Sequence, residues 1–234
     1  MTIIDRTLGD LVAERPGVAP TLDRLGLDYC CHGDRTVAEA AGVAGLDVAA
    51  VADALDAAAS AASGDGGDGG TAWTALDLAA LADHIESTHH AYLHAELPDI
   101  VALADKVRTV HGSRHPELSE VAHLVDAIAA DLEPHLAKEE RILFPAIRAI
   151  AGGQRDFPFG SVLNPIRVMS QEHDAAGELL ARLRSVTSDY AVPADGCASY
   201  QSLYERLEAL ELDTHLHIHK ENHSLFPRAI EASS

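Results

Sequence analysis

The stretch His135-Leu-Ala-Lys-Glu139, followed by Leu143-Phe-Pro145, recurs 82 residues further along the chain as His217-Ile-His-Lys-Glu221 and Leu225-Phe-Pro227. Each copy carries a histidine and a glutamate four positions apart. In an α-helix such a pair lies on one face, about one turn apart. The repeat therefore predicts two helices that each present an imidazole and a carboxylate, and two such helices can close on a pair of metal ions.

Both pairs lie within apolar stripes. The residues at helical spacing around them are Ile128, Leu132, Ile142 and Leu143 in the first copy and Leu203, Leu207, Leu210, Thr214 and Leu225 in the second. The stripe turns Glu139 toward the core, whereas Glu140, about 100° further round the helix axis, is expected to be a solvated neighbour. Burying a carboxylate without a partner costs several kcal/mol, and no Lys or Arg shares these stripes. The pattern therefore predicts a bound cation.

Two more histidines precede the repeated segments by almost the same distance. His90 lies 45 residues before His135, and His173 lies 44 residues before His217. Each lies on an apolar stripe of its own, so the chain reads as two helical hairpins. Each hairpin then supplies one histidine from its first helix and a His/Glu pair from its second. The predicted metal ligands are His90, His135, Glu139, His173, His217 and Glu221.

A single histidine on an apolar stripe is usually a hydrogen-bonded core residue, but four in matched positions indicate metal. The remaining histidines lack that support, and we expect them at the surface or behind the ligands: His84, His89, His94, His111, His115, His123, His215, His219 and His223. His94, one turn from His90, is the best reserve ligand.

Imidazole and carboxylate ligands without thiolate suit iron or manganese, and can also hold zinc. Two octahedral ions offer about twelve positions, and the six side chains with one bridging oxygen leave roughly one position open on each. Such a centre is predicted to be reactive. Ferritin-like bundles use Glu-x-x-His instead, and Glu86–His89 and Glu120–His123 match that spacing. We interpret both as chance matches, since His123 cannot reach the depth of His135.

The composition predicts an all-α protein, because alanine is abundant, aromatic residues make up 4% of the chain, and strand-like alternation is not sustained. The formal net charge of −20 argues against nucleic-acid and anionic-membrane partners, which require a basic face. No apolar run has the length of a membrane span, and the N-terminus lacks a signal-peptide core. We therefore expect a cytoplasmic protein without a disulfide framework, since it has only 3 cysteines.

Glycine and aspartate divide the chain. The stretch 63–70, Ser-Gly-Asp-Gly-Gly-Asp-Gly-Gly, predicts a flexible linker over 61–72, between a small helical module at 1–60 and a bundle at 73–234. The bundle is predicted to be an up-down-up-down four-helix bundle. Its expected helices begin at the caps Thr74 and Asn164 and near Pro116 and Cys197, and they cover about 74–108, 116–150, 164–190 and 197–231.

The N-terminal module contains a thiol-rich loop with Cys30 and Cys31, followed by His32. Adjacent cysteines seldom bond to each other, because the small ring strains the peptide. As free thiols beside His32 and near a helix start they are predicted to have lowered pKa values and to bind soft metal, iron or nitric oxide. The alternative is a pair of small buried residues in a tight turn. Two thiolates and one imidazole are too few for a structural zinc site.

These motifs together resemble the Repair of Iron Centres family. The resemblance rests on Asp28-Tyr-Cys-Cys31 in the N-terminal module, His135-x-x-x-Glu139, Glu172-His-Asp-Ala-Ala-Gly-Glu-Leu-Leu180 and His217-x-x-x-Glu221-Asn, in that order. It covers nearly the whole chain, and the glycine-rich linker is its least typical part. The resemblance implies a haemerythrin-like bundle with two non-haem iron ions, oxo-bridged when oxidised, held by the six ligands that the stripes select. Cys30 and Cys31 match the family's adjacent thiols.

The family is associated with repair of iron–sulfur clusters damaged by oxidative and nitrosative stress, by supplying iron. The implied partners are damaged iron–sulfur proteins or cluster-assembly components, with nitric oxide or oxygen as small ligands. Two other functions stay open: redox turnover that reduces nitric oxide at the two ions, and sensing of oxygen or nitric oxide. Whether the protein is an enzyme depends on which of these holds.

Overall fold

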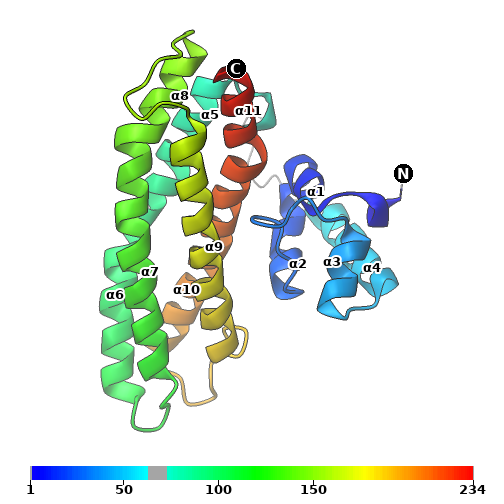
Figure 1. Ribbon diagram of the computed structural model, residues 1–234. Helices are drawn as coiled ribbons and strands as arrows, with labels where there is room; N and C mark the ends of the chain where they lie inside the picture. Colours follow the sequence, from blue (N-terminus) through cyan, green and yellow to red (C-terminus); the bar gives the residue numbers. More distant parts are fainter. Residues whose placement is uncertain (1, 63–72, 234) are drawn as a thin grey trace.

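The computed structural model describes residues 2–62 and 73–233, and every regular element in these ranges is helical (Figure 1). The expected linker falls largely on 63–72, outside the described residues. The N-terminal helices are short, and they lie beside the long rods of the bundle (Figure 1). They are α1 (Leu8–Glu14), α2 (Ala19–Arg24), α3 (Val37–Ala44) and α4 (Val48–Ala62), with 3-10 turns at Ile3–Asp5 and Pro16–Val18.

Side-chain caps begin two of these helices. The Thr7 hydroxyl accepts a hydrogen bond from the Asp10 amide at 3.1 Å. Thr36 and Glu39 form a reciprocal capping box at the start of α3. Such caps satisfy amides that have no partner within the helix, which is why threonine is favoured at these positions. Thr36 and Glu39 have the Thr-x-x-Glu spacing that is typical of such a box.

Four rods running alternately up and down make the bundle, as predicted (Figure 1). Three of the rods are divided by a five-residue π-helical segment: Glu86–His90, Glu139–Leu143 and Glu221–Leu225. The helices on either side of these segments are α5 (Leu78–Ile85) and α6 (Ala91–His111), α7 (Leu118–Lys138) and α8 (Phe144–Ala151), and α10 (Ala198–Lys220) and α11 (Phe226–Ser233). The third rod, α9 (Leu163–Val186), is a continuous α-helix.

The π-helical segment after Glu139 corrects one predicted core position. Ile142 was expected in the apolar stripe, but it is 50% exposed, whereas Leu143 is 1% exposed. A π-turn contains more residues than an α-turn, so the chain beyond it is rotated relative to a pattern that continues at 3.6 residues per turn. The prediction for Ile142 assumed an unbroken α-helix and was wrong for this reason.

Two predicted helix starts are also wrong. The first rod is capped by Asp77, whose carboxylate accepts from the Ala80 amide at 2.8 Å, because Thr74 lies in a separate 3-10 turn. Helix α9 begins at Leu163, so Asn164 lies inside the helix and is not its cap. The side-chain Nδ2 atom of Asn164 instead donates to the Phe159 carbonyl at 3.0 Å. This helix also ends earlier than expected, since residues 188–190 have positive φ angles of 51°, 61° and 56° and cannot continue it.

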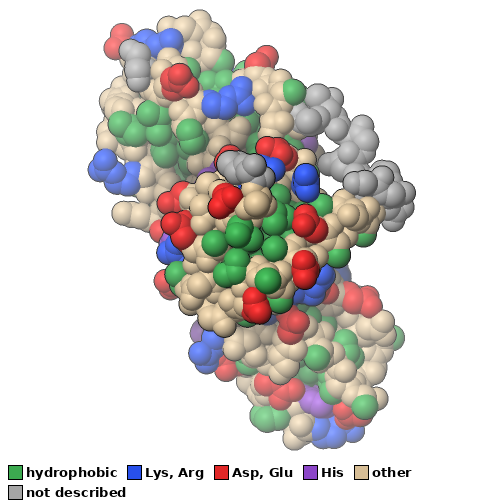
Figure 2. Space-filling model, turned by 90° about the vertical axis from the view of Figure 1, so that its right-hand side faces the viewer, with side chains coloured by type: hydrophobic (Ala, Val, Ile, Leu, Met, Phe, Trp, Pro, Cys, Tyr) green, Lys and Arg blue, Asp and Glu red, His purple; other side chains and the backbone are tan. Residues whose placement is uncertain are grey.

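Apolar side chains form two separate clusters. The larger joins the lower bundle to the N-terminal helices and includes Leu93, Leu132 and Leu22. The smaller lies at the opposite end of the bundle, around Phe144 and Phe226. Acidic side chains are scattered over the face in Figure 2, consistent with the net charge of −20. None of the helices described in 2–62 and 73–233 is both long and apolar enough to cross a membrane.

Candidate metal centre

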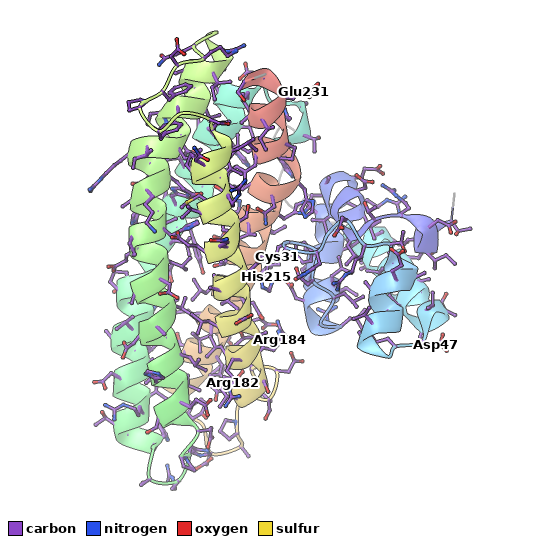
Figure 3. The ribbon with its side chains drawn as sticks, in the orientation of Figure 1. Cys31, Asp47, Arg182, Arg184, His215 and Glu231 are labelled. Carbon is purple, nitrogen blue, oxygen red and sulfur yellow. The ribbon has the colours of Figure 1, made fainter. Side chains whose placement is uncertain are left out.

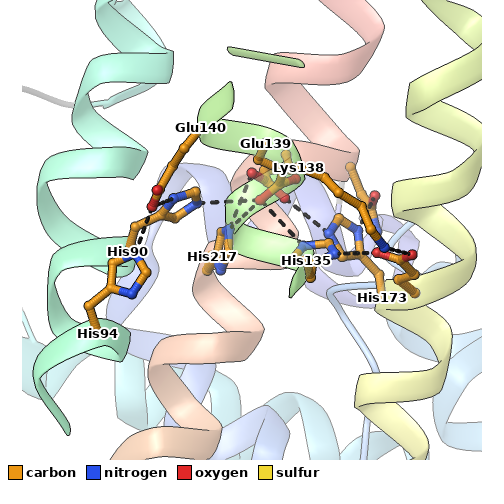
Figure 4. Close-up of polar contacts among 11 residues, drawn as sticks. His90, His94, His135, Lys138, Glu139, Glu140, His173 and His217 are labelled. Atoms are coloured by element: carbon orange, nitrogen blue, oxygen red, sulfur yellow. Dashed lines mark hydrogen bonds and ion pairs between the residues drawn. The ribbon is translucent and has the colours of Figure 1, made fainter. Parts of the chain in front are cut away.

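The four rods bring the six predicted ligands together at one depth in the bundle (Figure 4). His90 ends the first π-helical segment, and Glu139 and Glu221 begin the other two. The imidazoles of the other three ligands come from α7, α9 and α10, and all six residues are at most 3% exposed: His90, His135, Glu139, His173, His217 and Glu221.

Both carboxylates are shared between two ligand groups. His90 and His217 lie with Glu139 and Glu221 in one group, and His135 and His173 lie with the same two glutamates in the other. Within each group the ligand atoms all lie within 4.8 Å of one another. The His173 Nε2 atom is 3.0 Å from Glu221 Oε2, and the His135 Nε2 atom is 3.3 Å from Glu139 Oε2. This arrangement is suitable for a binuclear metal site.

The outer nitrogens of three of the predicted ligand histidines face hydrogen-bond acceptors. The Nδ1 atom of His90 lies 3.1 Å from Glu140 Oε1, that of His135 lies 3.0 Å from Glu172 Oε2, and that of His173 lies 3.0 Å from Asn222 Oδ1. Each of these Nδ1 atoms therefore donates a proton, which leaves the inner Nε2 atom with a lone pair. Such pairing is typical of histidines that bind metals.

The inner atoms fit a metal pair. The Nε2 atoms of the four histidines and both oxygens of Glu139 and Glu221 are buried without a hydrogen-bond partner. Lone pairs that face carboxylate oxygens repel each other unless a proton or a cation lies between them. Two cations would satisfy all of these atoms, so the donor set fits the group that the sequence predicts.

Glu140 is more than the solvated neighbour that the sequence predicts. Its carboxylate accepts from His90 and also from His94 Nε2 at 2.7 Å. His94 is the reserve ligand of the sequence interpretation, but its side chain is 51% exposed and it is turned toward Glu140 (Figure 4). The structure therefore does not bring His94 to the ligand cluster.

Neither Glu-x-x-His match supplies a residue to the ligand groups. Glu86 pairs with Arg148, and Glu120 pairs with Arg182 at 2.6 Å. His123 is exposed. His89 is buried beside the ligands, where its ring stacks on His217 with 5.7 Å between the centroids. Its nitrogens contact Asp213 and Lys220, each at 2.8 Å.

Sequence reasoning did not assign the outer partners Glu172 and Asn222. Both are next to a predicted ligand, since Glu172 precedes His173 and Asn222 follows Glu221. Asn222 also has the position in the second copy that Glu140 has in the first. Aligning the two copies one residue beyond the His/Glu pair would have singled out this position.

The thiol loop is built around Asp28. Its Oδ1 atom accepts from the amides of Cys30 at 3.1 Å and Cys31 at 2.8 Å, and Oδ2 lies 2.6 Å from His32 Nδ1. The two Sγ atoms are 3.6 Å apart, and both thiols are free. The hydrogen bond with Cys31, together with burial, raises the pKa of the Cys30 thiol, contrary to the lowered value predicted. The sulfurs face a carboxylate rather than the start of a helix, which explains the difference.

The loop packs against the last rod of the bundle. His219 contacts the Tyr29 carbonyl, and the side chains of Asn222 and His223 both contact the Cys30 carbonyl at 3.1 Å. A cavity of about 650 Å3 between the loop and α9 is lined in part by both cysteines. A second cavity, of about 320 Å3, is lined by His135, His173 and His217. The candidate metal centre thus has a cavity of its own, which shares no lining residue with the cavity at the thiol loop.

Removing the metal should make stability depend on pH through His135. Burial disfavours its charge, but the charge of Glu139 outweighs burial and raises the pKa of His135 from 6.5 to about 9. This stabilisation is complete below pH 6.5 and is lost as the pH rises through 9, at a cost of about 3 kcal/mol. We expect a lower melting temperature for the metal-free protein at pH 9.5 than at pH 6.5. Thermal denaturation followed by circular dichroism measures this, and equal melting temperatures would contradict it.

The metal-loaded protein is the control for this experiment. Metal holds the imidazole in its deprotonated form at both pH values, so the difference in melting temperature should largely disappear.

Two families describe the two parts of the chain. The Hemerythrin HHE cation binding domain matches residues 81–229, and a domain of unknown function, DUF542, matches residues 4–59. The chain therefore belongs to the hemerythrin HHE cation-binding family, and its full-length relatives carry the name iron-sulfur cluster repair protein.

Three of these relatives show how complete the similarity is. A probable iron-sulfur cluster repair protein of Haemophilus influenzae is 34% identical over 230 residues, 98% of this chain and 99% of its own length. The iron-sulfur cluster repair protein YtfE of Enterobacter sp. is 34% identical, and YtfE of Escherichia coli O157:H7 is 32% identical, with the same coverage. The likeness therefore includes the thiol module as well as the bundle.

Proposed function

We propose that this protein repairs iron–sulfur clusters damaged by oxidative and nitrosative stress, and that it does so in the cytoplasm by donating iron. The buried set of four histidines and two shared carboxylates carries this proposal, because imidazole and carboxylate suit iron. The six ligands would hold two non-haem iron ions. The relatives' names support the repair role, and damaged iron–sulfur proteins or cluster-assembly components are the proposed recipients.

The cavity beside the ligands supports the release of an ion. It is lined by the ligands His135 and His173 and by Glu172 and Asp131, whose carboxylates suit a departing cation. Glu172 pairs with Lys138 at the same cavity, so part of its charge is balanced. In this proposal the side chains of the protein bind and orient the iron ions, and the ions themselves are what the protein delivers.

Cys30 and Cys31 are the proposed thiols for handing iron over. With Asp28 they form a third group whose ligand atoms lie within 4.8 Å of one another. The Cys30→Ser/Cys31→Ser variant should bind iron normally but lose most of its ability to restore an iron–sulfur enzyme inactivated by nitric oxide. Recovery of that enzyme's activity, together with iron analysis, measures both effects.

The Cys197→Ser variant is the matched control. Cys197 is exposed and contacts His111 near the opposite end of α10, so its replacement should leave repair unchanged. Full repair by the double variant would remove Cys30 and Cys31 from the function.

Reduction of nitric oxide is the second candidate function. The closeness of the two ligand groups favours it, because two ions at shared carboxylates can bind two small molecules side by side. Anaerobic addition of nitric oxide to the diferrous protein, with an excess of a chemical electron donor that returns both irons to the ferrous state, should then yield nitrous oxide over several turnovers. A stable nitrosyl adduct without nitrous oxide would count against turnover.

A further inference from the structure

The two hairpins anchor a ligand histidine in the same way but with different chemistry. In each, the residue directly after the shared glutamate accepts a hydrogen bond from the Nδ1 atom of the histidine on the hairpin's first helix. In the first hairpin this residue is Glu140, 3.1 Å from His90. In the second it is Asn222, 3.0 Å from His173. A carboxylate in one copy thus corresponds to an amide in the other.

An amide has a donor as well as an acceptor, and Asn222 uses both. Its Nδ2 atom donates to the Cys30 carbonyl at 3.1 Å while its Oδ1 atom faces His173. A backbone carbonyl only accepts, so it fixes which end of the amide points to the thiol loop. The oxygen is thereby directed to His173 and the proton to the Nδ1 atom of that ring. A carboxylate at this position would have no proton to donate to Cys30.

Among the described residues, Glu140 makes no comparable hydrogen bond to the N-terminal module. Its other partner is His94, whose side chain is 51% exposed. The N-terminal module, in contrast, packs tightly against the second hairpin. A methyl group on Gly33 would lie 2.6 Å from His223 Nε2, and Asp23 accepts from His215 Nδ1 at 2.8 Å. Of these two equivalent positions, the one that contacts the N-terminal module is asparagine (Asn222), and the one that does not is glutamate (Glu140).

We propose that Asn222 is a positioning residue through which the docked thiol loop orients His173, so that the N-terminal module completes one of the two metal positions. The affected position is the one with His135 and His173, because Asn222 bonds to His173 and to neither histidine of the other group. The coupling is reciprocal, since whatever displaces the loop frees the amide and whatever removes the amide loosens the loop. The inference rests on the proposed iron pair but not on the repair activity.

The first experiment replaces Asn222 in the full chain loaded with iron-57. In the Asn222→Leu variant the Mössbauer spectrum should change for one of the two irons, and that iron should pass to a chelator about 10-fold to 100-fold faster. The matched Glu140→Leu variant should change the other iron instead. Identical effects of the two variants, or no effect of Asn222→Leu, would overturn the proposal.

The Asn222→Asp variant tests the two hydrogen bonds of the Asn222 side chain separately. Aspartate still accepts from His173 but faces the Cys30 carbonyl without a donor. We expect faster hydrogen exchange of the loop amides with a smaller change in the iron spectrum than in Asn222→Leu. Unchanged loop protection would contradict a bond between Asn222 and the loop.

The reverse experiment changes only the module. The Gly33→Ala variant introduces a methyl group that would collide with the Tyr29 carbonyl and lie 2.6 Å from His223 Nε2, which should displace the loop without altering a ligand. It should change the Mössbauer signal of the same iron that the Asn222→Leu variant changes. Gly177→Ala is the control, because its methyl group would meet Cys31 Sγ at an ordinary 3.9 Å.

The outcomes distinguish this inference from the proposed function. If Gly33→Ala leaves both irons unchanged, the coupling is wrong even though the iron pair exists. If the wild-type protein holds no iron pair, the proposed function itself fails.

Discussion

Replacing Glu221 with glutamine is expected to reduce the metal content from about two ions per chain to one or fewer. Glu221 belongs to both ligand groups, so its loss affects both ions. Although burial opposes its charge, His217 and His173 hold the pKa of the Glu221 carboxyl well below its ordinary value. Glutamine keeps the shape but removes the negative charge, and its amide donor would point toward histidine lone pairs. Metal analysis of the purified variant measures the result.

Glu140→Gln is the control for this prediction. Glutamine can still accept the hydrogen bond from His90 Nδ1, and Glu140 lies outside both ligand groups. This variant should keep two ions. A Glu221→Gln protein that also held two ions would show that the carboxylate does not bridge.

The second large effect concerns stability at the lower bundle. Replacing Arg184 with methionine is expected to reduce the free energy of unfolding by about 3–5 kcal/mol, because it leaves the buried carboxylate of Glu211 without its partner. Glu211 is 2% exposed and accepts three hydrogen bonds from Arg184, two of them from Nε at 3.1 and 2.9 Å. Arg184 also lies over the Tyr190 ring, 4.9 Å from its centroid. Urea unfolding of the metal-loaded protein measures the change.

Arg182, two residues earlier on α9, provides a matched control (Figure 3). It pairs with Glu120 at 2.6 Å, but its side chain is 63% exposed, so water and salt screen the interaction. Arg182→Met should change the free energy of unfolding by at most about 1 kcal/mol. Similar losses in the two variants would show that burial of Glu211 does not determine the effect.

The sequence predicted the hairpins and the convergence of the six ligand residues because each signal was local and repeated. A histidine and a glutamate on one helical face follow from spacing alone, and His90 and His173 follow from equal offsets. Ile142 was misplaced because the local pattern does not show where an α-helix changes to a π-helix. The raised pKa of Cys30 depends on the contact between the two sulfurs and on burial of the thiol. Neither can be read from the spacing of residues in the sequence.

The outer partners show a similar limit. Glu140 and Asn222 were visible as equivalent positions, but their histidine partners lie 50 and 49 residues away. The role of Asn222 depends further on Cys30, which lies 192 residues away. Only the docked arrangement of the module brings these three residues into one chain of hydrogen bonds.

The division of the apolar side chains into two clusters bears on how the molecule unfolds. The ligand layer lies between the core around Phe144 and the larger core that extends into the N-terminal helices. The six candidate ligands form this layer, and a metal pair held there would bond to side chains from all four rods. Bound metal would therefore add stability at the level where the apolar packing is interrupted. We expect the upper end of the bundle to unfold more readily in the metal-free protein than in the metal-loaded one.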